Sequence, residues 1–108
     1  MKPNGRNDPE KVFRGQLHSV VRNLERAIDD LLENFWEEPL RRHAQELSSA
    51  LLDSCKAYGY LELGSVARAI HSLVALPMEE VLTLEQPLRE KLKELVGLLK
   101  EMAAILAA

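Results

Sequence analysis

Residues 47–70, LSSALLDSCKAYGYLELGSVARAI, decide the fold of this chain. Apolar residues recur every three or four positions on both sides of Gly59. This spacing is typical of amphipathic α-helices, so the segment predicts one helix before the glycine and another after it. Gly59 can adopt the left-handed backbone conformation that ends a helix. The stretch therefore predicts a helix, a glycine turn and a second helix antiparallel to the first.

A further amphipathic segment precedes this pair. It begins at Asp8 and Pro9, where an N-cap side chain is followed by proline at the first helical position. Apolar residues then recur at spacings of three and four, and we expect this helix to end near Trp36. Pro39 can open the next helix because its missing N–H would have no partner there. That helix is expected to run to Gly59.

The third predicted helix runs from about Leu61 to Leu76, and the last follows a capping-box pattern at Thr83 and Gln86. The last helix has the cleanest apolar periodicity in the chain. Its members are Leu88, Leu92, Leu95, Leu99, Met102 and Leu106. With short connections between them, the helices predict an all-α, up-down four-helix bundle. We expect one domain over residues 9–108, preceded by a flexible N-terminus at residues 1–8.

Composition narrows the class of function. The net charge is −3 and there is no concentrated basic segment, which argues against a nucleic-acid partner. The single cysteine cannot form an internal disulfide, and the chain has neither a signal peptide nor an apolar run of the roughly 18 residues that suggest a membrane span. We therefore expect a cytoplasmic protein without a membrane segment. No cluster has metal-ligand spacing, so we predict neither a metal nor another cofactor.

The order of residues around Gly59 resembles the centre of a histidine-phosphotransfer (Hpt) domain, the relay module of multistep two-component signalling. Gly59 matches the glycine that ends the phosphorylated helix in that family, and Leu47 and Cys55 match apolar and small positions before it. Residues 60–63 and 66–70 match the helix that follows. The similarity covers the second and third helices, and the outer two only as amphipathic helices. It implies a small four-helix bundle.

The resemblance also implies that the phosphotransfer site is missing. Counting back from Gly59 by the family spacing gives Ser49 where the family has its phosphorylated histidine. The lysine and glycine that the family places on the next turn are replaced by Leu52 and Asp53. Serine lacks the imidazole nitrogen that forms a phosphoramidate, and Asp53 would repel a phosphoryl group. The chain is therefore similar to a degenerate member of the family.

Ser49 is expected on the exposed side of its helix, because 100° per residue places it opposite the apolar stripe. The same count places Leu52 outside that stripe, and an exposed leucine among polar groups suits a partner surface. We predict a protein-binding face formed by Arg42, Gln45, Glu46, Ser49, Leu52, Asp53 and Lys56. The resemblance implies that its partner is a receiver domain or a histidine kinase. The chain would then act as a non-phosphorylated adaptor or inhibitor and not as an enzyme.

Two alternatives remain open from the residues. His43 is a rival phosphoacceptor on the same helix, which would make the chain an active phosphotransfer protein. The chain could instead be an assembly protein whose last helix forms a homodimer through Leu88, Leu92, Leu95, Leu99 and Met102. His71 is a weaker candidate than His43, since no lysine or glycine follows it, and His18 is isolated. Cys55 falls on the apolar stripe, which predicts a buried, unreactive thiol.

Overall fold

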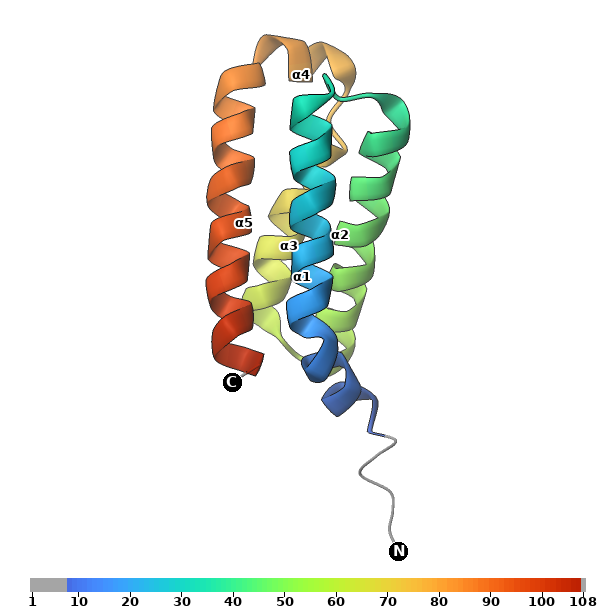
Figure 1. Cartoon of the computed structure of the whole chain (residues 1–108), viewed down its shortest axis with the longest axis vertical. Helices are drawn as coiled ribbons and strands as arrows, with labels where there is room; N and C mark the ends of the chain where they lie inside the picture. Colours follow the sequence, from blue (N-terminus) through green and yellow to red (C-terminus); the bar gives the residue numbers. More distant parts are fainter. Residues whose placement is uncertain (1–7, 108) are drawn as a thin grey trace, which may run out of the picture.

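The computed structural model describes residues 8–107, which contain α-helices and no β-strand (Figure 1). The helices, in chain order, are α1 (Pro9–Glu33), α2 (Glu38–Tyr58), α3 (Leu61–Val74), α4 (Met78–Thr83) and α5 (Glu85–Ala107). The predicted all-α class is confirmed for this part of the chain. The predicted flexible N-terminus lies outside the described residues except for Asp8, which is the N-cap of α1.

The four longer helices pack around one core. Helices α1 and α3 each contact both α2 and α5, while the short α4 packs against α5 at one end of the molecule (Figure 1). The first described residues and the end of α5 lie at the opposite end (Figure 1). The largest fully buried side chains come from all five helices and include Leu17, Ile28, Leu51, Ile70, Val81, Leu92 and Leu99.

The leucines of α5 line this core and not an external seam. Leu88, Leu92, Leu95 and Leu99 are at most 8% exposed, and Met102 alone among the five predicted dimer residues is partly exposed. Packing of α5 against α1 and α3 thus accounts for the regular leucine spacing. The predicted homodimer seam is therefore not available for pairing with a second chain.

Local signals set the start of α1 and the end of α2. The Asp8 carboxylate accepts a hydrogen bond from the Glu10 N–H at 3.0 Å, and Gly59 ends α2 with φ 80°, so both predicted signals are confirmed. The first helix ends at Glu33, earlier than predicted. Phe35 and Trp36 then adopt positive φ values of 54° and 61°. This bend turns the chain toward α2 and buries the Trp36 ring.

The predicted capping box at Thr83 is wrong. Thr83 is the last residue of α4, and its hydroxyl donates to the Glu79 carbonyl at 2.9 Å. Such a bond to the preceding turn competes with capping of the following helix. Leu84 separates the two helices, and α5 begins at Glu85.

Side chains from neighbouring helices satisfy carbonyl groups at or just beyond the last turns of α1 and α3. The Gln45 amide donates to the Val74 carbonyl at 2.9 Å, and the Arg41 guanidinium donates to the Leu76 carbonyl. The Arg89 guanidinium donates to the Leu32 carbonyl at 3.0 Å. Helix C-terminal carbonyls lack intrahelical partners and attract positive charge. These bonds therefore tie α2 to α3 and α5 to α1.

Helices α2 and α3 approach each other closely at Gly64. A Cβ atom added to Gly64 would lie 3.2 Å from the Cβ atom of Cys55, closer than ordinary packing allows. Glycine at this position thus lets the two backbones meet. Cys55 is 1% exposed, and burial raises the pKa of its thiol to about 11, which confirms the predicted buried thiol.

The space around each glycine predicts opposite effects on stability for substitutions at Gly64 and Gly97. Gly64→Leu should lower the free energy of unfolding by about 1–3 kcal/mol, because the new side chain has no room against Cys55. Gly97→Ala in α5 is the matched control, since a Cβ atom added there would have no neighbour within 4 Å, and it should stabilise the fold by about 0.5–1 kcal/mol. Urea unfolding measures both. Equal stability of Gly64→Leu and the parent chain would contradict the close approach.

Candidate protein-binding face on α2 and α3

A shallow depression lies on the outer side of α2 and α3. Its volume is about 440 Å³, and its lining includes five of the seven predicted binding residues: Arg42, Gln45, Glu46, Ser49 and Asp53. Ala50 of α2 and His71 of α3 complete the lining. The spacing along α2 brings the five residues to one side of the helix, as predicted.

Leu52 is not part of this exposed surface. It is only 9% exposed and belongs to the core, so its prediction as an exposed apolar residue is wrong. The physical reason is Gly64, whose missing side chain lets α3 cover the flank of α2 that carries Leu52. Lys56 is exposed but lines a separate hollow of about 170 Å³ with Arg68 of α3.

Beneath the depression, buried Ser48 anchors His71. The Ser48 hydroxyl donates to the Ala44 carbonyl at 2.8 Å, and its oxygen lies 3.1 Å from Nδ1 of His71. A hydroxyl has one proton, which the backbone carbonyl takes here, so we assign the Nδ1–H of His71 as the donor to Ser48. This bond fixes the ring and its tautomer. Nε2 of His71 has no protein partner among the described residues and is reachable by solvent.

His71 lines the depression although the sequence favours His43 over it, and the chain carries a signal for this placement. Three pairs join α2 to α3: Cys55 with Gly64, Ser48 with His71, and Gln45 with Val74. The members of each pair lie equally far along the chain from the turn at residues 59–60. A helical hairpin folded about that turn therefore predicts His71 opposite Ser48.

Charge on the face is mixed and partly unpaired. The Arg42 guanidinium lies 3.4 Å from the Glu38 carboxylate, but both side chains are 66% exposed, so this pair contributes little to stability. Glu46 and Asp53 have no ionic partner within residues 8–107. The depression thus offers two unpaired carboxylates, a guanidinium and a hydroxyl to a partner.

The other histidines lie away from the depression. His43 is exposed on α2 but does not line it. His18 lies on α1, where its Nε2 accepts from the Arg22 guanidinium at 2.9 Å. The described part of the chain contains no group of three or more His, Cys, Asp or Glu side chains arranged to hold a metal ion.

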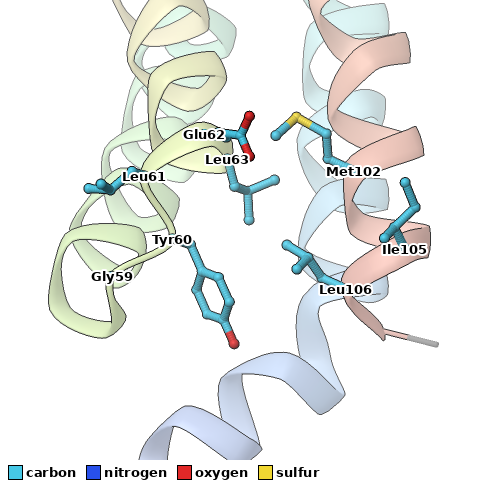
Figure 2. Close-up of a pocket in the computed structure, with 8 residues that line it drawn as sticks. All are labelled: Gly59, Tyr60, Leu61, Glu62, Leu63, Met102, Ile105 and Leu106. Carbon is cyan, nitrogen blue, oxygen red and sulfur yellow. The ribbon is translucent and has the colours of Figure 1, made fainter.

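A second hollow, which the sequence did not indicate, lies between the start of α3 and the end of α5 (Figure 2). In Figure 1 these segments lie at the end of the bundle opposite α4. The hollow has a volume of about 430 Å³. Most of its lining is apolar: Leu61, Leu63, Met102, Ile105 and Leu106.

Comparison with protein families, curated proteins and solved structures finds no match to this chain. No helix within residues 8–107 is long and apolar enough to cross a membrane. The geometry of the two surfaces is therefore the basis for a functional proposal.

The anchoring of His71 by Ser48 is testable by NMR. Ser48→Ala removes the acceptor of the Nδ1–H bond, so the ring should lose its preference for the Nδ1–H tautomer, and the fold should lose about 1 kcal/mol of stability. Long-range ¹H–¹⁵N correlation spectra of the neutral imidazole report the tautomer directly. His43→Ala serves as a control and should leave the His71 signals unchanged. An Nε2–H tautomer in the parent chain would refute the assignment.

Proposed function

We propose that this chain is an Hpt-like protein that binds a receiver domain or a histidine kinase through the depression around Ser49. It would act as an adaptor or inhibitor that does not pass on a phosphoryl group. The observation that carries the proposal is the placement of Ser49. This residue lines a surface depression on α2, at the family spacing before the glycine turn that ends the helix.

The proposal includes an up-down four-helix arrangement, with α1, α2, α3 and α5 as its members. Two observations support it: each long helix contacts two others around one core, and α4 is a short helix between α3 and α5. In this view α4 is an addition to the last connection of the bundle. The added helix would leave the α2–α3 face open.

The chemistry of the face supports binding without transfer. Ser49 has no imidazole nitrogen, and Asp53 shares its depression and would repel a phosphoryl group. Leu52, at the position of the family's lysine, is buried and cannot neutralise that charge. Hydrogen-bonding groups on a shallow surface are still suited to contact with another protein.

Substitution of Ser49 tests the face. Ser49→Arg places a long, charged side chain in the depression and should weaken binding to the partner by about tenfold or more, which corresponds to about 1.4 kcal/mol. The measurement is titration calorimetry with purified receiver and kinase domains from the native cell. His43→Arg is the matched control, because His43 is exposed on the same helix outside the depression. Unchanged affinity of Ser49→Arg would place the interface elsewhere.

Phosphoryl transfer is tested separately. After incubation with a phosphorylated receiver domain, the chain should carry no acid-labile phosphate, since Ser49 cannot form a phosphoramidate. Radiolabel retention on a neutral gel, with and without acid treatment, measures this. Label that disappears in His43→Ala would establish the active phosphotransfer alternative, and label that disappears in His71→Ala would place the acceptor on α3. Either outcome would overturn the adaptor proposal.

A further inference from the structure

The hollow at the end of the bundle has exposed apolar walls. Figure 2 shows Glu62 and Leu63 of α3, with Tyr60 just before it, on the side toward Met102 and Leu106 of α5, whereas Leu61 points away from α5 at the edge of the hollow. Leu61 is 79% exposed and Ile105 is 76% exposed, so two large apolar side chains stand in solvent beside the opening. Leu63, which is buried, lies between the two helices.

This apolar surface continues along α5. Leu98, Met102 and Ile105 follow one another at spacings of four and three and therefore share a face of the helix. Leu98 is 44% exposed, whereas Leu92 and Leu99 on the neighbouring face are fully buried. The α5 helix thus presents exposed apolar side chains at Leu98 and Ile105, and the half-buried Met102 between them also packs against the core. Exposed apolar side chains grouped beside an apolar hollow are suited to contact with a partner.

The charged side chains around the hollow favour a basic partner. Glu62 lines the hollow, and no lysine or arginine does. Glu101, beside Met102 on α5, is also exposed, and neither glutamate has an ionic partner among residues 8–107. A second copy of the chain, docked through the same surface, would bring these glutamates near like charges. A basic partner would instead neutralise them.

We propose that this hollow and the adjoining exposed side chains of α5 bind a basic amphipathic helix of a partner protein. The apolar side chains of that helix, at positions i, i+4 and i+7, would fill the hollow between the start of α3 and the end of α5 and pack on Leu98. Its lysine or arginine side chains would meet Glu62 and Glu101. This is the helix-in-groove mode of recognition, in which apolar anchors supply affinity and flanking charges supply orientation. The site is separate from the α2–α3 face and does not rest on its function.

Two synthetic peptides test the proposal. Both carry leucines at the spacing i, i+4 and i+7, and they differ only in having lysines or glutamates on the flanks. Fluorescence anisotropy should show saturable binding of the lysine peptide, weakening as salt is raised, and at least tenfold weaker binding of the glutamate peptide. Ile105→Glu and Leu61→Glu should each reduce the affinity for the lysine peptide at least tenfold. Both side chains are exposed, so the variants should keep the parent fold, which circular dichroism checks.

Leu82→Glu is the matched control. Leu82 is 72% exposed on α4, at the other end of the bundle, so this variant should bind the lysine peptide as the parent chain does. Glu62→Lys should shift the preference toward the glutamate peptide.

Three results of the peptide titrations would overturn the proposal. They are no saturable binding of the lysine peptide, equal affinity for the two peptides, and affinity unchanged by Ile105→Glu. A dimer that appears in sedimentation analysis and is lost in Ile105→Glu would also overturn it, because a second copy would then occupy the surface. None of these outcomes bears on the Ser49 face, which Ser49→Arg tests independently.

Discussion

The close approach of α2 and α3 at Cys55 and Gly64 sets the register on which the rest of the candidate site depends. Because Gly64 has no side chain, the two backbones meet there, and a Cβ atom at that position would lie 3.2 Å from the Cβ of Cys55. In this register Ser48 faces His71 and Gln45 reaches the Val74 carbonyl. The depression around Ser49 needs residues from both helices, so it exists only in this register.

The groups with reactive chemistry in this hairpin are withdrawn from solvent or held in place. Burial raises the pKa of the Cys55 thiol to about 11, so the thiolate is scarce at neutral pH. The Ser48 hydroxyl is fully buried and committed to a backbone carbonyl. What remains accessible is a set of polar groups on a shallow surface. Because the reactive groups are buried and the accessible groups only form hydrogen bonds and ion pairs, the face is suited to binding a partner.

Sequence patterns predicted the four long helices, but not α4, and most of the outward side of α2, because these depend on spacing along one helix. The N-cap at Asp8 and the turn at Gly59 are equally local features, and both are confirmed. The errors arise where packing of a neighbouring helix determines whether a side chain is buried or exposed. Leu52 lies on a flank of α2 that periodicity alone leaves open, and α3 covers it. The regular leucines of α5 could serve a core or a seam, and only the packing against α1 and α3 decides between them.

Helix α3 links the two proposed surfaces, since its His71 lines the depression at Ser49 and its first residues line the apolar hollow. The central claim is that the α2–α3 face contacts the partner. Titration of the ¹⁵N-labelled chain with a receiver or kinase domain, followed by amide chemical shifts, tests it most directly. The account predicts that the largest changes fall on residues around Ser49 and Asp53 of α2 and His71 of α3. Changes confined to α1 and α5, or none at saturating concentrations of either domain, would contradict it.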